Sequence, residues 1–261
     1  MNARWLSACL LLAGGGSAAA QEDDTVKAVR SDFHALLNAN AAKQRKSPPA
    51  AGVSLPPASD AELLGFVDRC WRIYDRSEGE PAEFDALTEI LALTATNGAA
   101  GPRLEESWRN AAERLFTGFA DDDRMAGVVL RPPAPTSLAK QANAWCEDVR
   151  GRTRNPEVLA AFEFKALQDD LSRNSQGQLD EAREQALVAK LRQLAARFGP
   201  QTVPFRNVTY AEFVKNTIYS IEHLKIGAVA PEIAAEDLDG VPFKLSDYRG
   251  KAVLLDFWGY W

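Results

Sequence analysis

One ionisable residue stands inside an otherwise apolar run close to the end of the chain. Asp256 interrupts Ala252 to Trp258 (AVLLDFW), a run that predicts an interior strand of a sheet covered on both faces. An unpaired carboxyl group is costly to bury in such a strand. This cost favours a functional role for Asp256 over the alternative, which is an ordinary polar residue at the end of a strand.

The cysteines and histidines offer less chemistry. Cys70 and Cys146 each stand beside a tryptophan on an apolar helical face, where a free cysteine is often simply buried. A disulfide between them remains an alternative in an oxidising compartment. Neither has an adjacent base, so we predict that neither is catalytic. His34 and His223 lie far apart without ligand-like neighbours, and we expect no metal site and no cofactor.

Three consecutive acidic residues, Asp121 to Asp123, suggest a calcium ligand set. No EF-hand spacing follows them, however. We therefore expect a solvated loop at this position.

Residues 1–20 have the pattern of a secretory signal. A positive start is followed by an apolar run, Trp5 to Ala13, and by small residues from Ser17 to Ala20 before a cleavage site at Gln21. The apolar run is too short to span a bilayer. We expect an exported protein, periplasmic or extracytoplasmic, without a lipid anchor at Cys9, because most of the apolar run follows that cysteine.

Composition limits the classes of partner. The 261 residues are 46% hydrophobic and 25% charged, as in globular proteins, and the formal net charge is −6. This acidic balance argues against a nucleic-acid partner. The chain also has no Lys/Arg block for an anionic membrane surface and, after the signal, no apolar segment long enough to span a membrane.

Apolar residues at helical spacing predict a mainly α protein. Residues 21–58 form an N-terminal helix and a Pro-rich linker, and residues 59–224 a helical domain. The helices show no fixed repeat period, so an irregular bundle is expected rather than a solenoid. The expected helices are Thr25 to Lys46, Ser59 to Tyr74, Pro81 to Asn97, Pro102 to Phe119, Thr136 to Val149, Asn155 to Leu171, Asp180 to Phe198 and Thr209 to Leu224.

The sequence pattern changes in residues 225–261. Asp239-Gly240 is a hairpin turn signal between "AAEDL" and the alternating run Val241 to Leu245. A loop, Ser246 to Gly250, then leads into the apolar run that contains Asp256.

Residues 227–261 resemble the start of a thioredoxin-like α/β domain of the redoxin (AhpC/TSA) superfamily. They are most similar to TlpA-like thiol-disulfide oxidoreductases. The resemblance implies that residues 225–261 are the first β-elements of such a domain, truncated before its active site. Four features carry it in order: Gly-x-x-Ala-Pro from Gly227, Asp-x-Asp-Gly from Asp237, Leu245 to Lys251, and the strand that ends Asp-Phe-Trp-x-x-Trp.

In this family the residue after the second tryptophan is the first cysteine of a Cys-x-x-Cys pair. Trp261 matches that tryptophan, so the resemblance implies redox cysteines just beyond it. A cysteine at a helix N-terminus has a lowered pKa and can attack a disulfide near neutral pH. The second cysteine resolves the mixed disulfide. We expect the chain that ends at Trp261 to be inactive in disulfide exchange.

The resemblance also implies roles for three residues of this chain. Asp256 matches the buried carboxylate that accepts the proton of the resolving cysteine, and desolvation would raise its pKa toward neutrality. Many TlpA-like proteins carry Asn there, so Asp points toward the thioredoxin pattern. Trp258 and Trp261 would pack around the cysteine pair, or would be plain core residues.

Two other functions remain open. A peroxiredoxin-like antioxidant enzyme needs a Pro-x-x-x-Thr-x-x-Cys loop, which "FWGYW" does not begin. A non-catalytic helical binding module is the other alternative. As an oxidoreductase, the protein would have protein thiols and disulfides as partners, together with an electron-donating thiol protein.

The C-terminal segment would lack most of its burial partners in this chain. A parallel neighbour for the Asp256 strand needs a crossover helix and a further strand. We therefore expect the segment to be poorly ordered or to dock on the helices.

Overall fold

The computed structural model describes most of the chain, in four ranges: residues 24–46, 56–98, 100–225 and 227–256. The signal predicted at residues 1–20 lies outside the described residues, as do Trp258 and Trp261. The signal and the roles of the two tryptophans therefore stay predictions.

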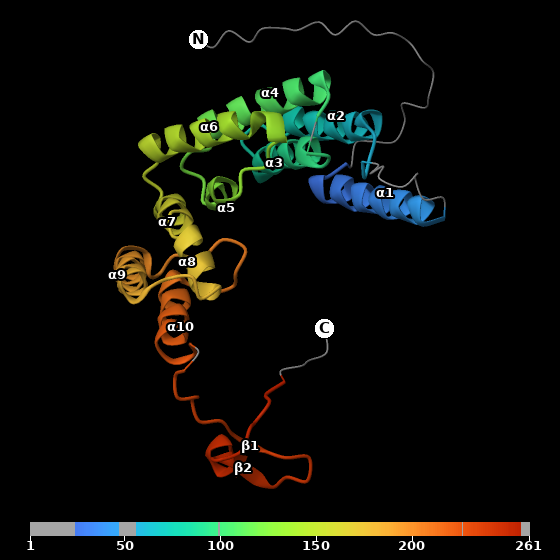
Figure 1. The fold of residues 1–261 in the computed structure, drawn as a ribbon. Coiled ribbons are helices and arrows are strands. Elements are labelled where there is room, and N and C mark those ends of the chain that lie inside the picture. Colours follow the sequence, from blue (N-terminus) through green and yellow to red (C-terminus); the bar gives the residue numbers. More distant parts are fainter. Residues whose placement is uncertain (1–23, 47–55, 99, 226, 257–261) are drawn as a thin grey trace, which may run out of the picture. The chain divides into compact units, whose positions relative to one another are not determined.

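Helices dominate the described residues (Figure 1). Short 3₁₀ turns at Thr136–Leu138 and Leu245–Tyr248 join them, along with two short strands, β1 (Ala234–Glu236) and β2 (Pro242–Lys244). The helices are α1 (Val26–Lys46), α2 (Asp60–Arg76), α3 (Pro81–Ala95), α4 (Pro102–Gly118), α5 (Met125–Leu130), α6 (Ala139–Arg152), α7 (Pro156–Lys165), α8 (Gln168–Ser175), α9 (Glu181–Phe198) and α10 (Tyr210–His223).

These elements divide into two compact units. The first combines residues 1–120 with 132–151, and the second combines 121–131 with 152–261. The first therefore contains α1 to α4 and α6, and the second contains α5, α7 to α10 and the hairpin. The domain boundaries expected from the sequence remain a proposal.

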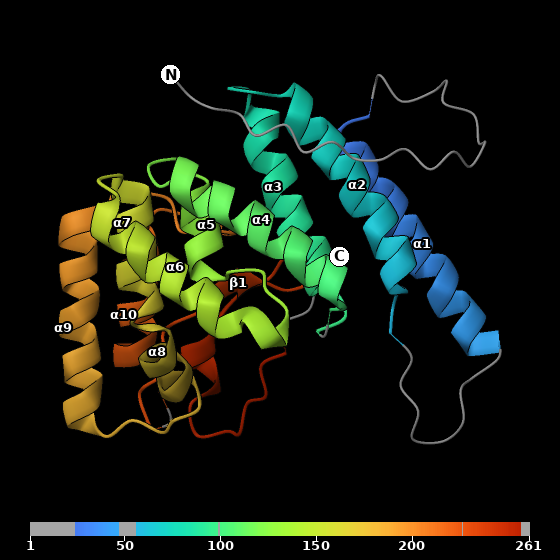
Figure 2. The same ribbon diagram turned by 90° about the horizontal axis from the view of Figure 1, so that it is seen from above.

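The first unit is built on α2, which packs against α1, α3 and α4 (Figure 2). The helix starts where its sequence predicts, because Ser59 and Glu62 form a reciprocal capping box. From that start, one face of α2 turns inward and is fully or almost fully buried. The residues of this face are Leu63, Val67, Cys70 and Ile73.

Helix α1 packs within this unit through one apolar face and ion pairs. Val29 and Phe33 are buried, and the Phe33 ring meets the Phe66 ring edge-on at 5.3 Å. Arg30 donates hydrogen bonds to the carboxylate of Glu89 on α3. Glu89 is only 5% exposed. The ion pair therefore neutralises a carboxylate that would otherwise be buried without a partner.

In the second unit, α9 packs against α7, α8 and α10, and α5 packs against α7. The core is continuous and apolar apart from the phenol of Tyr210. Its buried members are Leu130, Ala160, Phe164, Leu167, Leu187, Val188, Leu191, Leu194, Phe198, Val203, Tyr210, Val214 and Ile221.

The helices of this unit differ from the sequence prediction in two places. The single helix expected from Asn155 to Leu171 is broken into α7 and α8, because Leu167 turns into the core and the chain tightens, with its amide bonded to the carbonyl of Phe164. Helix α5 was not predicted. Its six residues, between an acidic triplet and a Pro-rich segment, are too few to show a helical period.

The hairpin forms as predicted, but the strand after it does not. β1 and β2 pair antiparallel with Ala235 opposite Phe243, and Gly240 has the positive φ of 77° that its turn requires. Residues 252–256 are neither strand nor helix, in contrast to the interior strand expected there. The physical reason is that these residues have no neighbouring strand to complete their backbone hydrogen bonds among the described residues.

The Arg30–Glu89 contact makes a stability prediction. Arg30→Met should lower the free energy of unfolding by about 2 kcal/mol, because it leaves the buried Glu89 carboxylate without its charged donor. Adding Glu89→Leu should restore most of the loss, since an apolar pair replaces an ion pair at little net cost. Urea denaturation measures both variants. A double variant less stable than Arg30→Met would contradict this explanation.

Candidate functional site

The hairpin turn is held by a single carboxylate. Asp237 Oδ1 accepts hydrogen bonds from the amides of Asp239 at 2.9 Å and Val241 at 2.8 Å. The Asp237 carbonyl also accepts from Gly240 at 3.0 Å. The aspartate and glycine of the Asp-x-Asp-Gly motif therefore have a structural explanation, which is that they close the turn locally.

A second set of contacts folds the following segment back on the hairpin. The amide of Ser246 donates to Glu232 at 3.0 Å, and the amide of Lys244 donates to Asp247 at 2.9 Å. Hydrogen bonds from Ser246 hold the pKa of Glu232 below its ordinary value. These contacts fix the backbone of residues 244–247, which come shortly before Lys251 and the apolar run.

Asp256 lies on the surface of the described structure, together with its apolar neighbours. Val253, Leu254 and Leu255 are 46%, 94% and 48% exposed, and Asp256 is exposed as well. The resemblance implies a buried carboxyl group at this position, and the described chain does not bury it. The strands and helices that would cover it are not among the described residues. The proton-accepting role of Asp256 stays a prediction, as do the packing roles of Trp258 and Trp261.

The exposure of the C-terminal run predicts its hydrogen-exchange behaviour. The amides of Leu254 and Leu255 should exchange at rates near those of an unfolded chain. Those of Leu87 and Ile90 in α3, which are fully buried, should exchange at least about a thousandfold more slowly. Exchange followed by NMR in a monomeric sample measures this. Helix-like protection of Leu254 and Leu255 would contradict the structure.

Both cysteines of the described chain are buried, and neither is part of a disulfide. Cys70 lies on the inner face of α2 and Cys146 on α6, and they do not form the disulfide that was left open. Burial raises the pKa of the Cys70 thiol to about 12, with a further contribution from the nearby Glu89 carboxylate. A thiol with that pKa is protonated at neutral pH and is a poor nucleophile.

The raised pKa of Cys70 predicts a loss of stability in alkaline solution. The unfolded thiol ionises above pH 9, whereas the folded one resists ionisation until about pH 12. The stabilising effect is complete below pH 9 and is lost as the pH rises toward 12. Denaturation at several pH values should show a steeper alkaline decline for the parent protein than for Cys70→Ala. Equal slopes would contradict the burial of this thiol.

The acidic triplet has a structural use in the second unit. Asp121 Oδ1 accepts from the Thr153 hydroxyl at 2.9 Å and from the Arg154 amide at 2.7 Å, and these bonds lower its pKa. Asn155 donates to Asp123 at 2.6 Å and caps α7 with its own side-chain oxygen. Within the described part of the chain, no group of three His, Cys, Asp or Glu residues is placed to hold a metal ion. In the same ranges, no helix has the length and apolar composition to cross a membrane.

A segment of 36 to 40 residues is similar to curated thiol-disulfide oxidoreductases. The relatives are ResA proteins. The chain is 50% identical over 36 residues to ResA of Geobacillus thermodenitrificans (strain NG80-2) and 53% identical over 36 residues to ResA of Geobacillus kaustophilus (strain HTA426). It is 45% identical over 40 residues to ResA of Bacillus thuringiensis subsp. konkukian (strain 97-27).

Each match covers 14% or 15% of this chain and 21% or 23% of the relative, so the chain spans about a fifth of the length of the curated relatives it matches. The matched length is close to the 35 residues from Gly227 to Trp261. No family model matches the chain. No solved structure matches it either.

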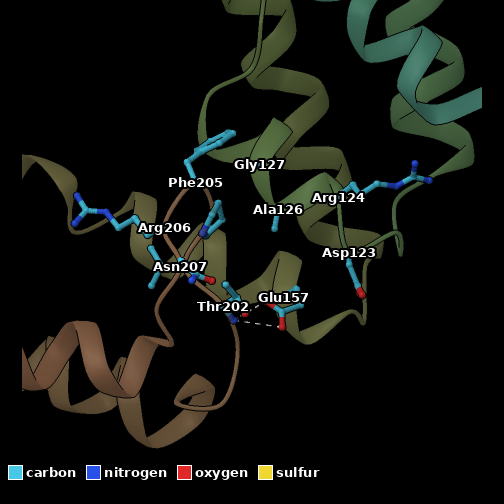
Figure 3. Close-up of a pocket in the computed structure, with 11 residues that line it drawn as sticks. Asp123, Arg124, Ala126, Gly127, Glu157, Thr202, Phe205, Arg206 and Asn207 are labelled. Carbon is cyan, nitrogen blue, oxygen red and sulfur yellow. Dashed lines mark hydrogen bonds between the residues drawn. The ribbon is translucent and has the colours of Figure 1, made fainter. Parts of the chain in front are cut away.

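A second feature of the structure was missed by the sequence analysis. A pocket of about 730 Å³, here called the Phe205 pocket, opens in the second unit (Figure 3). It is lined by Asp123, Arg124, Ala126, Gly127, Glu157 and residues 202–207. The only sequence signal was an aromatic residue and an arginine in the short loop between α9 and α10, which has no recognisable spacing.

Proposed function

We propose that this chain is part of an exported thiol-disulfide oxidoreductase. It would exchange electrons between protein thiols and disulfides through a Cys-x-x-Cys pair that follows Trp261. The observation that carries the proposal is the 45–53% identity to ResA proteins over a segment as long as the C-terminal one. These relatives are named thiol-disulfide oxidoreductases, which favours thiol-disulfide exchange over the peroxiredoxin alternative. The predicted signal at residues 1–20 supports export.

The proposed reaction is a balanced two-electron exchange. The first thiolate attacks a partner disulfide, forming a mixed disulfide and releasing one partner thiolate. The second cysteine loses its proton to Asp256 and attacks the mixed disulfide. The partner leaves as a dithiol and the Cys-x-x-Cys pair becomes a disulfide, which an electron-donating thiol protein must reduce again.

The described residues that support this proposal are those that lead into the expected active-site strand. The hairpin and the Ser246–Glu232 contact define the approach of the chain to residues 252–256. We propose that residues 225–261 are the first β-elements of a thioredoxin-like domain in an otherwise mainly α chain. In a complete domain, further strands would cover Val253 to Leu255 and bury Asp256, while Trp258 and Trp261 would pack beside the cysteines.

The coding sequence downstream of Trp261 is the first test. A Cys-x-x-Cys pattern that starts at the next codon is expected, and the polypeptide that contains it should reduce insulin disulfides. The chain that ends at Trp261 should not. Asp256→Asn in the longer polypeptide should slow the reaction at least about tenfold near neutral pH, with a smaller effect at alkaline pH, because hydroxide then replaces the proton acceptor.

Two controls keep this test specific. Cys70→Ala and Cys146→Ala should leave the reductase rate of the longer polypeptide unchanged, because both thiols are buried in helices. Replacing either cysteine of the downstream pair by serine should abolish the reaction. A reading frame without these cysteines, or an active chain that ends at Trp261, would refute the proposal.

A further inference from the structure

Helix α1 has the smallest share of buried residues among the described helices of the first unit. Three of its 21 residues, Val26, Val29 and Phe33, are buried, whereas α3 buries eight of 15. No residue from His34 to Lys46 is buried. Apolar burial therefore stabilises the packing of α1 less than that of its neighbours.

Arg69 of α2 holds the start of α1 through two carboxylates. Its Nε and Nη2 atoms donate to the carboxylate of Asp24, shortly before α1, each at 2.7 Å. Nη2 also lies 2.9 Å from the carboxylate of Asp32 on α1. The side chains of Asp24 and Arg69 are only 8% and 17% exposed. A bidentate, partly buried pair of this kind is stronger than an exposed ion pair.

The Arg30–Glu89 pair attaches the same part of α1 to α3. The ion pairs of α1 and its buried side chains thus lie in one stretch, residues 24–33. Further along α1, an exposed hydrogen bond from the Asn40 amide to the carbonyl of Pro57 joins the helix to the segment before α2. Charged contacts therefore carry a large part of the attachment of α1.

The segment between α1 and α2 is suited to movement of α1. Residues 47–57 are Pro-rich in sequence, and 11 extended residues span at most about 40 Å. Ala58, by contrast, is 1% exposed, and its carbonyl accepts from Asn97 at 2.7 Å. The chain is therefore fixed again at Ala58, so that α1 can leave its place without displacing α2.

Cys70 lies close to the attached stretch, on the inward face of α2, and is fully buried. Burial raises the pKa of its thiol most, and the charges of Glu89, Asp24 and Arg30 also act on it. Cys146, the other buried cysteine of the described chain, belongs to the same unit but lies on α6. Since α1 packs against α2 and α3 (Figure 2), the two thiols report on different parts of one unit.

We propose that α1 is a strap that opens from α2 and α3 and closes again while α2 to α4 and α6 stay folded. Segments with few buried apolar contacts open with free energies below that of global unfolding. The contacts of Asp24, Asp32 and Glu89 with arginines keep the strap closed, and its opening brings solvent to the Cys70 face of α2. The strap therefore controls the access of other molecules to that face.

This device is independent of the proposed redox chemistry. The strap belongs to the first unit, whereas the C-terminal segment belongs to the second. Its test measures the access of a reagent to buried thiols and not the reduction of disulfides. Each proposal can therefore fail while the other stands.

Alkylation of cysteines by iodoacetamide under native, mildly alkaline conditions tests the proposal on the full chain. Peptide mass spectrometry assigns each modified residue, so that Cys9 does not interfere. Cys70 should be alkylated at least about tenfold faster than Cys146, because opening of the strap needs less free energy than unfolding of the unit. The comparison is made within the parent protein and needs no variant to fold.

A substitution in the Arg69 contact should act on one thiol alone. Asp24→Asn should raise the alkylation rate of Cys70 about tenfold or more, because it removes the charge that neutralises the partly buried Arg69. The rate of Cys146 should not change. Asp170→Asn, which breaks an ion pair of the second unit, is the matched control and should leave both rates as they are in the parent.

Hydrogen exchange gives a second measure of the same opening. The amides of Val29 and Phe33 should exchange faster than those of Leu87 and Ile90, although all four residues are buried. Asp24→Asn should accelerate exchange in α1 and leave exchange in α3 unchanged.

A weaker variant and the contrary outcomes complete the test. Asp32→Asn should raise the Cys70 rate less than Asp24→Asn does, because the Asp32 side chain is 59% exposed. Circular dichroism should show that both variants remain folded. Equal rates for Cys70 and Cys146 in the parent, an equal rise of both rates in Asp24→Asn, or an unchanged Cys70 rate in that variant would overturn the proposal.

Discussion

Burial of apolar helix faces is the interaction on which the described structure depends. Leu63, Val67 and Ile73 show it in α2, where residues spaced three or four apart all turn inward. Each unit brings several such faces together, and each gains about 25 cal/mol for every Å² of apolar surface removed from water. The C-terminal run has comparable side chains, but among the described residues no second apolar face packs against Val253 to Leu255, and they stay exposed.

This dependence on apolar burial explains how polar groups are placed within the two units. A carboxylate in a helical core needs a charged or hydrogen-bonding partner, and Glu89 has Arg30 for this purpose. Asp121 stabilises a loop of the second unit, because its carboxylate accepts hydrogen bonds from the Thr153 hydroxyl and from the backbone amides of Arg154 and Asn155. The acidic triplet that suggests a calcium ligand set in the sequence is thus used to tie α5 to the start of α7.

The two candidate sites illustrate opposite relations between local and tertiary structure. The C-terminal segment has strong sequence signals and almost no tertiary support, so its proposed chemistry rests on the resemblance and on the partial matches to ResA proteins. The Phe205 pocket has weak sequence signals and a defined three-dimensional setting. Its lining residues come from α5, α7 and the loop before α10, which are far apart in the sequence.

Local physics allowed much of the helical fold to be predicted from the sequence. Ser59 and Asn155 start α2 and α7 because their side chains accept the first free amides, and Asp239-Gly240 closes the hairpin because glycine tolerates positive φ. The tertiary structure decided what depends on distant residues. It broke the helix at Leu167 to fill the core, formed α5 from six residues, and left neither Cys70 nor Cys146 in a disulfide. It also brought Phe205 against Gly127, a contact that no spacing in the sequence could show, because the two residues come from separate elements joined only by packing.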